Sequence, residues 1–539
     1  MTPDEVLLSG VHEIVPTPSP ASENPQAVSP FQSVLFLHAD DYKDIENQSA
    51  PDFFKDLNLD QVVDAITDGY KEYNLAPFFY AHLQDLDSVA YRQEVMRDLE
   101  TGRLVEAITT FSAAMRAMRK HLKQAQELYY RYAIERGFLG AVAIYYNGVG
   151  TLSLELASID LNSRGLRAFR EFLAQYVASP EFRKLVNDGD NLVSDFSRIR
   201  YSLILKDGSV TVRSYEEESD YSETVEETFA KFSRETSNNY RLKAPAPDTI
   251  NHIQAQILDG VALLYPDTFQ ALDDFNVRHA DHLDPTISRF DREIHFFIAY
   301  LSYSERLRRA NFSFCLPEIS QTSKEVRASD AFDIVLADKL LRENQTVVCN
   351  SFVLRNRERM LVVSGPNHGG KTTFARMFGQ LHYLGSLGCP VPGKDAALFL
   401  WDRIFTHFEH EEDIANLRGK LHDDLVRIRA ILDLATPNSI VIMNEIFSST
   451  TIQDAVHLSK KVMAKFADLD VLGVCVTFLD ELASFNEKTV SMVSMVDPQD
   501  PVIRTYRLER RPADGLAYAH AIAEKYRVTY QYLKERIRA

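Results

Sequence analysis

Residues 359–380 read RMLVVSGPNHGGKTTFARMFGQ, an apolar segment, a glycine-rich turn and then apolar residues at helical spacing. Gly365, Gly370, Lys371 and Thr372 occupy the four fixed positions of the phosphate-loop pattern G-x-x-x-x-G-K-S/T. In such a loop, backbone N–H groups and a helix N-terminus surround a polyphosphate, the lysine reaches the terminal phosphates, and the hydroxyl meets Mg²⁺. The stretch therefore predicts a strand, loop and helix that bind a nucleotide. A glycine turn before a core helix is the simpler alternative.

The whole loop supplies the residues that we expect to contact the nucleotide. They are Gly365, Pro366, Asn367, His368, Gly369, Gly370, Lys371, Thr372 and Thr373. A lone histidine such as His368 is more often a loop side chain than a catalytic group, because proton transfer needs a positioned partner.

The bulk composition limits the class of protein. A chain of 539 residues suggests three or four domains or subdomains, and 45% hydrophobic residues leave enough apolar surface for large cores. The formal net charge of −18 argues against a chain that coats nucleic acid through its overall field, because neutralising phosphates needs clustered Lys and Arg. Any contact with nucleic acid must therefore be local.

Cysteine spacing and the chain start bear on the cellular compartment. The four cysteines are far apart and show no C-x-x-C spacing, which is typical of a reduced protein without a zinc site. The first residues lack a basic and an apolar signal region, and no apolar run reaches the length of a membrane span. We expect a soluble, cytoplasmic protein.

Changes in pattern along the chain predict an α+β protein with several domains. Residues 1–32, rich in Pro and Ser, read as a disordered tail. Residues 33–310 read as a mostly helical domain, interrupted at residues 198–213 by alternation around Asp-Gly, which predicts a β-hairpin. Residues 311–539 begin with loops and strands up to about residue 357 and continue as an α/β phosphate-loop domain.

Two charged segments lie in the helical part. Arg116, Arg119, Lys120 and Lys123 fall on neighbouring helical turns and form either a basic stripe or an ordinary solvated face. An acidic run follows the hairpin from Glu216 onward, and such a run repels phosphates.

A second apolar strand ends in polar side chains that complete the expected site. Residues 438–443 and 471–477 read as buried strands, with a helix over 455–466 between them, which predicts a mostly parallel sheet. Asn444 stands where nucleotide ATPases place a metal-supporting Asp, so the expected metal site is Thr372, Asn444 and Glu445 with weakened Mg²⁺ affinity. Glu445 is the candidate general base, and a solvent-facing strand-end carboxylate is the alternative.

Four motifs together resemble the ATPase domain of the MutS family of DNA mismatch repair proteins. They are GPNHGGKT at 365–372, DRIFT at 402–406, IVIMNEI at 440–446 and TFLDEL at 477–482. The Gly-Pro-Asn opening and the DRIF segment distinguish this family from other phosphate-loop proteins, since generic phosphate loops lack them. The similarity spans about residues 360–538. The helical part resembles the family's core and lever helices more loosely, with the hairpin at the clamp position, and residues 505–539 resemble the C-terminal dimerisation segment.

The resemblance implies an ABC-type ATPase that works as a dimer and uses ATP/ADP and Mg²⁺ to move helical arms around DNA. Four departures qualify this. The N-terminal mismatch-reading domain is expected to be absent. Residues around Arg418, Gly419 and Lys420 replace the signature Ser-Thr, Asn444 replaces Asp, and Phe478 replaces the His after the switch residue Thr477. Nucleotide binding should therefore persist while hydrolysis is slow or conditional, with Arg418 or Lys420 as a cationic contact in trans.

Hydroxyls at 448–451, SSTT, either cap the next helix or line a dimer interface, and capping is the default interpretation. Two functions remain open. The leading one is an ATP-binding protein that recognises mismatched, branched or otherwise structured DNA, as a homodimer and with repair or regulatory partners. The alternative is a nucleotide-gated scaffold for a protein. A transport or chromosome-structure ATPase fits less well, because its signature and any membrane span or long coiled coil are missing.

Overall fold

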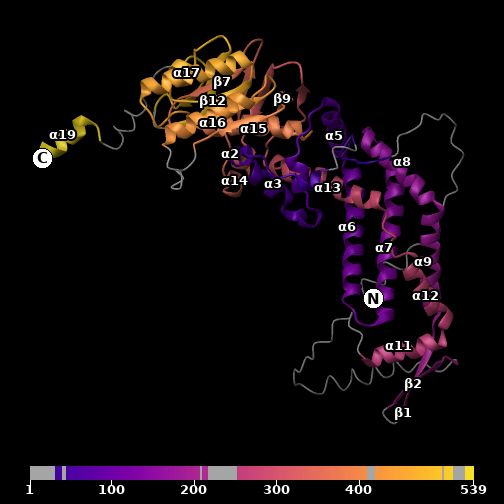
Figure 1. Ribbon diagram of the computed structural model, residues 1–539. Helices are drawn as coiled ribbons and strands as arrows, with labels where there is room; N and C mark the ends of the chain where they lie inside the picture. The colour runs from indigo at the N-terminus through magenta and orange to yellow at the C-terminus, as the bar shows by residue number, and fades with distance from the viewer. Residues whose placement is uncertain are drawn as a thin grey trace, which may run out of the picture.

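A long helical arm and an α/β body meet at an angle in the computed structural model, so that the chain forms an L (Figure 1). The structure describes residues 31–38, 44–206, 209–216, 252–409, 419–500, 503–513 and 528–538. The tail predicted at 1–32 lies outside these residues except for its last two positions, where Phe31 packs edge-on against Phe169 with ring centroids 5.1 Å apart. Among the described residues, no helix combines the length and apolarity needed to cross a membrane.

The arm is built on two long helices joined by a short turn, α6 (Gly102–Gln126) and α7 (Arg131–Ala157). Buried Ile108, Phe111 and Met115 recur at helical spacing on α6, so one apolar stripe packs against α7. α6 forms the edge of the arm that faces the inside of the L (Figure 1). Among the residues that the structure describes, the arm also contains α8 (Arg164–Ala178), α9 (Pro180–Arg198), α11 (His252–Leu264) and α12 (Pro266–Arg278). The helical prediction for this region is confirmed.

The predicted hairpin is confirmed at the far end of the arm. β1 (Tyr201–Lys206) and β2 (Ser209–Ser214) pair antiparallel with Leu203 opposite Val212. The strands begin a few residues later than predicted, because Arg198 still belongs to α9. The turn at 207–208 and the acidic run from residue 217 onward lie outside the described residues.

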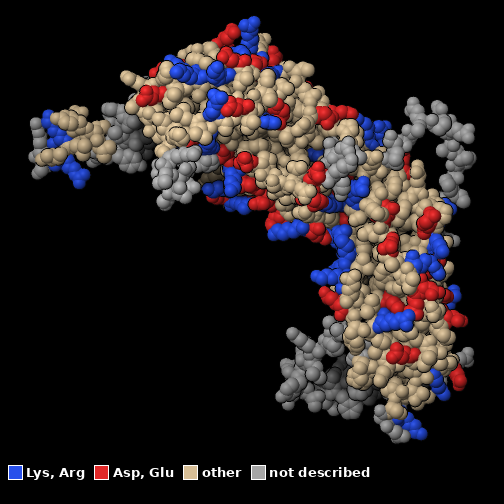
Figure 2. Space-filling model, in the orientation of Figure 1, with Lys and Arg blue, Asp and Glu red and all other residues tan. Residues whose placement is uncertain are grey.

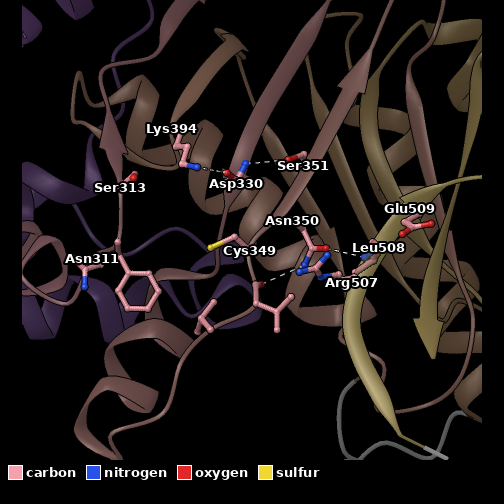
Figure 3. A pocket seen from close by; sticks show the side chains of 13 residues that line it. Asn311, Ser313, Asp330, Cys349, Asn350, Ser351, Lys394, Arg507, Leu508 and Glu509 are labelled. Atoms are coloured by element: carbon pink, nitrogen blue, oxygen red, sulfur yellow. Dashed lines mark hydrogen bonds and ion pairs between the residues drawn. The ribbon is translucent and has the colours of Figure 1, made fainter. Parts of the chain in front are cut away.

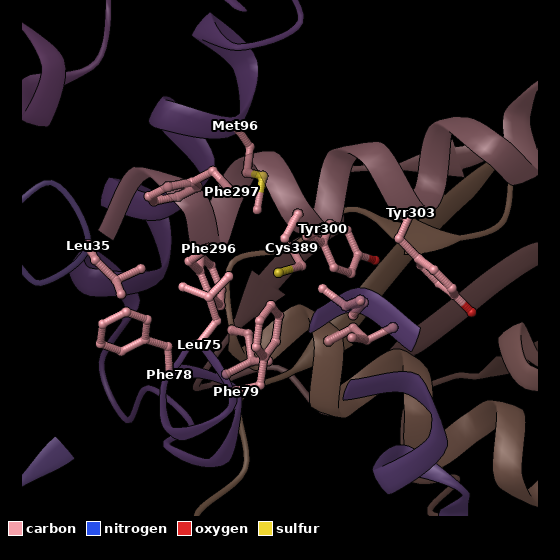
Figure 4. Close-up of a cluster of buried hydrophobic side chains, with 14 of the residues drawn as sticks. Leu35, Leu75, Phe78, Phe79, Met96, Phe296, Phe297, Tyr300, Tyr303 and Cys389 are labelled. Carbon is pink, nitrogen blue, oxygen red and sulfur yellow. The ribbon is translucent and has the colours of Figure 1, made fainter. Parts of the chain in front are cut away.

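A buried cluster joins the arm to the body (Figure 4). α13 (Pro285–Arg308) supplies Phe296, Phe297 and Tyr300, which lie with Phe79 and Met96 among side chains that are at most 1% exposed. Short elements from the start of the chain complete this junction. They are η2 (Ile45–Asn47), α2 (Phe53–Leu57), α3 (Leu59–Thr67), η3 (Asp68–Tyr73), α4 (Ala76–Tyr80) and α5 (Leu86–Asp98).

The body is organised around a six-stranded sheet in the order β10-β11-β12-β7-β13-β14. β10 to β13 run parallel and β14 pairs antiparallel with β13. The strands are β7 (Met360–Ser364), β10 (Ile404–His407), β11 (Ile440–Asn444), β12 (Leu472–Val476), β13 (Thr489–Val496) and β14 (Arg504–Arg510). The helices among the described residues of this domain are α15 (Lys371–Ser386), α16 (Lys420–Leu434), α17 (Ile452–Leu469) and η4 (Asp480–Leu482), and α19 (Tyr530–Arg538) lies apart from the sheet (Figure 1). The predicted strands and helix around β11, α17 and β12 are confirmed, with ends shifted by a few residues.

Smaller sheets cover the other end of α15. They contain β4 (Glu318–Ser320), β9 (Asp395–Phe399), β5 (Val326–Ala331) and β6 (Asn350–Leu354), and the pair β3 (Phe314–Cys315) with β8 (Val391–Pro392). The prediction of only loops and strands over residues 312–357 was wrong, because α14 (Ile334–Arg342) interrupts them. The Asp333 carboxylate accepts hydrogen bonds from the N–H groups of Val335 and Leu336, which starts this short helix.

Candidate nucleotide-binding site

The phosphate loop leaves the sheet at the carboxyl end of β7, which is buried along its whole length between β12 and β13. Gly365 (φ 115°) and Gly370 (φ 88°) adopt backbone conformations that favour glycine. His368 also has a positive φ of 60° and its side chain is exposed. The loop then opens directly into α15, so its N–H groups and the helix N-terminus face the same space.

Side chains of β13 and β14 hold the backbone of the loop in place. The Ser494 hydroxyl on β13 donates a 2.7 Å hydrogen bond to the carbonyl oxygen of Gly369. A Cβ atom at Gly369 would lie 2.3 Å from that hydroxyl oxygen, so the close approach requires glycine. Arg504 Nε donates to the carbonyl oxygen of Asn367 at 3.2 Å. The loop is therefore held in shape by residues more than a hundred positions away in sequence.

Lys371 is folded onto the inner face of the loop. Its ammonium donates to the carbonyl oxygens of Gly365 (3.0 Å) and Pro366 (3.2 Å), and its side chain is 4% exposed. Burial lowers the pKa of this ammonium, whereas the Glu445 carboxylate, 3.9 Å from Nζ, raises it. The charge is thus available where the terminal phosphates of a nucleotide would lie.

The residues predicted to hold Mg²⁺ meet at the carboxyl edge of the sheet. Thr372 Oγ1 donates a 3.1 Å hydrogen bond to Asn444 Oδ1, so two side-chain oxygens lie together. Glu445 follows with φ 56°, and its N–H donates to the carbonyl oxygen of Val476 at 2.9 Å. An all-oxygen set of this kind fits Mg²⁺, which prefers oxygen ligands and few direct protein contacts.

A pocket of about 770 Å³ extends from the loop. Its lining includes residues 367–373 and Glu445. The apolar lining residues are Phe332, Leu336, Leu340, Val347, Val348, Phe374 and Met377, and further polar ones are Asp333, Gln345, Thr346 and Asn350. A pocket that adjoins the phosphate loop and combines apolar with polar side chains suits a nucleoside joined to phosphates.

Tyr506 also lines this pocket, and sequence reasoning missed it. β14 carries an irregularity opposite Ser494 to Val496, and Tyr506 within it has φ 58°. The Asn350 side chain holds this segment, donating to the carbonyl oxygen of Tyr506 (3.0 Å) and accepting from the N–H of Leu508 (2.7 Å). Bulges commonly redirect a side chain next to a functional site. We find no local sequence signal for it.

A second, more open pocket of about 610 Å³ shares Val347, Val348 and Asn350 with the first (Figure 3). On its far side Lys394 Nζ pairs with Asp330 at 2.8 Å. Asn350 therefore stands between the two pockets and ties β6 to β14.

The remaining predicted residues do not all gather at the loop. Thr477 is buried, and its N–H donates to the carbonyl oxygen of Val363 at 3.0 Å, whereas Phe478 is 46% exposed. Gly419 precedes α16, and the Lys420 ammonium pairs with Glu409 of the same chain. Arg418 lies outside the described residues.

The capping interpretation of residues 448–451 is confirmed for Thr451. Its hydroxyl oxygen accepts a 3.2 Å hydrogen bond from the N–H of Asp454 at the start of α17. No described contact assigns the other three hydroxyls to a cap.

Comparisons with known proteins agree with this geometry. Residues 361–529 match the family model of MutS domain V. A region of 189 residues is 29% identical to Endonuclease MutS2 of Thermus thermophilus, and covers 35% of this chain. The match spans only a quarter of that relative's length, 25%.

The strand, loop and helix, the parallel sheet and the polar residues at the end of β11 define a P-loop ATPase domain. The match over residues 361–529 shows that this domain is similar to MutS domain V.

Proposed function

We propose that this chain binds ATP or ADP with Mg²⁺ and, as a dimer, converts nucleotide binding into movement of its arm on DNA. The observation that carries the proposal is the braced phosphate loop, whose Lys371 and Thr372 adjoin Asn444 and Glu445. A helical arm on a nucleotide-binding body gives binding energy a large element to move.

Each residue of the site takes one role in this proposal. Residues 365–373 hold the phosphates through backbone N–H groups, and Lys371 neutralises the terminal ones. Thr372 and Asn444 hold Mg²⁺, which supplies charge neutralisation at the phosphates when it is bound. Glu445 orients the attacking water and accepts its proton.

Hydrolysis should be slow in the isolated chain. Asn444 lacks the charge of an Asp, and Phe478 has no hydrogen-bonding group for a phosphate. To contact the nucleotide of a partner subunit, Lys420 would first have to break its ion pair with Glu409 of its own chain. We therefore expect turnover to depend on a partner subunit that exposes Arg418 and Lys420 to its neighbour's nucleotide.

The proposed partner is DNA, either mismatched, branched or otherwise structured, in mismatch repair or a related repair or recombination process. The similarity to MutS domain V and the L shape support it, because the arm and the body that the structure describes meet at an angle that an elongated ligand could occupy (Figures 1 and 2). A homodimer through residues about 505–539, other repair proteins as partners, and a cytoplasmic location complete the proposal.

A nucleotide-gated protein scaffold is the second candidate. The hairpin favours it, because Tyr201, Leu203, Ile204 and Val210 are each at least 39% exposed, and apolar side chains bind proteins better than phosphates. Binding to branched or mismatched DNA at low ionic strength would favour the first function, and its absence there would favour the second.

Calorimetry with Mg-ATP tests the nucleotide site. The unmodified chain should bind, Lys371→Ala should lose most of the affinity, and Glu445→Gln should bind while losing turnover by about a hundredfold or more. A folded chain that takes up no Mg-nucleotide would remove the proposal.

A further inference from the structure

We propose that the exposed basic face of α6, on the inner edge of the arm, binds the sugar-phosphate backbone of double-stranded nucleic acid. We define this α6 basic face as Arg116, Lys120 and Lys123. The inference rests on the DNA half of the proposed function and says where on this chain the contact is made.

The first argument is local charge. Residues 107–126 contain four Lys or Arg residues, one histidine and no acidic residue, in a chain with a net charge of −18. The net negative charge of the chain repels phosphates, so a contact with them needs a local group of basic side chains. This segment of α6 provides such a group.

The second argument is that the stripe is only partly neutralised within the protein. Arg119 is taken by Asp291, at 2.7 Å, and Arg116 lies 4.0 Å from Glu72. Lys120 and Lys123 are exposed and make no ion pair or hydrogen bond with the residues that the structure describes. The ammonium groups of Lys120 and Lys123 therefore face solvent, next to the Arg116 guanidinium, which is only weakly paired.

The third argument is geometry. On a helix that rises about 1.5 Å per residue, Arg116, Lys120 and Lys123 span about 10 Å, and one nucleic-acid strand carries a phosphate about every 3.4 Å along the duplex axis. Three cations on one rigid helix can therefore follow a few phosphates of one strand. Lys and Arg side chains gather on this inner edge of the arm (Figure 2).

The hairpin is less suited to the same ligand. Residues 198–227 contain four basic and eight acidic residues, a net charge of −4. Its exposed side chains include Leu203 and Ile204, which gain nothing from phosphates. The α6 basic face rather than the hairpin should then dominate the electrostatic part of binding.

The test compares three full-length variants by fluorescence anisotropy with a labelled duplex, at salt concentrations between about 0.05 and 0.2 M. The first is Lys120→Ala with Lys123→Ala on α6. The second, a matched control, is Arg183→Ala with Lys184→Ala, two exposed residues on α9, which packs on the opposite side of α7 from α6. The third is Arg200→Ala with Lys206→Ala at the hairpin. Mg-ATP binding confirms that each variant is folded.

We expect the α6 variant to raise the dissociation constant on the order of tenfold at about 0.1 M salt and to reduce the slope of log affinity against log salt by about two. The α9 control should change neither.

If the unmodified chain binds and the α6 variant binds equally well, or the hairpin variant alone loses binding, the inference is overturned while the proposed function stands. If the unmodified chain binds no duplex, the DNA half of the proposed function falls with it. If the α6 variant loses binding to an acidic protein segment but not to duplex, the face serves a protein partner and the inference is overturned.

Discussion

Thr372 and Asn444 are joined by a 3.1 Å hydrogen bond between their side chains, so the first turn of α15 and the end of β11 meet at one point. We expect Asn444→Asp to strengthen Mg²⁺-dependent nucleotide binding by about tenfold, because a carboxylate adds the negative charge that the amide lacks. Titration of Mg²⁺ at fixed nucleotide measures it. Asn444→Ala removes the oxygen and should act in the opposite direction, and equal Mg²⁺ dependence in all three chains would contradict this role.

The contact between Gly369 and Ser494 predicts a coupled pair. Gly369→Ala places a methyl group 2.3 Å from the Ser494 hydroxyl oxygen, which must displace the loop or β13. Nucleotide affinity should fall at least tenfold, since the loop's N–H groups lose their common direction. Adding Ser494→Ala removes the hydroxyl and should recover part of the affinity. A double mutant no better than Gly369→Ala would show that the carbonyl oxygen of Pro366, 3.0 Å from the same methyl, decides the outcome.

The polar half of the site was predictable from sequence because the phosphate-loop pattern fixes its members by covalent spacing. Residues 365–373 are neighbours in the chain, and the apolar strand before Asn444 indicated which sheet edge it would reach. The apolar half was not predictable. Val347, Val348 and Tyr506 come from segments outside the phosphate-loop pattern, and only the folded chain brings them to the loop.

Contacts between helices far apart in the chain could not be predicted from sequence for the same reason. The Gln380 amide on α15 donates to the carbonyl oxygen of Leu57 at 2.9 Å, a contact across 323 positions. Gln380 Oε1 also accepts from the N–H of Ile334, at the start of α14. The helix after the phosphate loop was predicted from sequence and α14 was not, and helical periodicity carries no information on which helices meet.

The backbone conformation and the position of Tyr506 predict that replacing it changes thermal stability and nucleotide affinity in opposite directions. A tyrosine at φ 58° costs roughly 1 kcal/mol relative to glycine, and its ring borders the nucleotide pocket beside Gly370. Tyr506→Gly should therefore raise thermal stability slightly while weakening nucleotide binding by about tenfold. Calorimetry and thermal unfolding on the same samples measure both. Tyr506→Phe is the control and should keep both values, and a glycine variant with unchanged affinity would exclude the ring from the site.

Glu293 on α13 predicts a pH dependence of stability. Its side chain is fully buried, and the carboxylate accepts hydrogen bonds from the Ser33 hydroxyl (2.7 Å) and the Val34 N–H (2.9 Å). Burial raises the pKa of this carboxyl group from 4.5 to about 7. The folded state holds this proton more tightly than the unfolded state. The contribution of Glu293 to the unfolding free energy is therefore fully present below about pH 4.5 and is lost as the pH rises towards 7. A pKa of about 7 in place of 4.5 corresponds to about 3 kcal/mol of unfolding free energy that is lost when Glu293 ionises in the folded state.

Glu293→Gln removes this titration while keeping an acceptor for Ser33 and Val34. We expect the difference in unfolding free energy between pH 5 and pH 8 to shrink by a few kcal/mol in the variant, mainly through a gain at pH 8. Asp291, whose pKa burial raises to about 6, titrates in both chains and therefore cancels in the comparison. Denaturant unfolding at the two pH values measures the effect. Glu293→Ala separates titration from the loss of the hydrogen bonds, because it should destabilise the junction at both pH values, and parallel pH profiles for Glu293→Gln and the unmodified chain would show that Glu293 stays ionised in the fold.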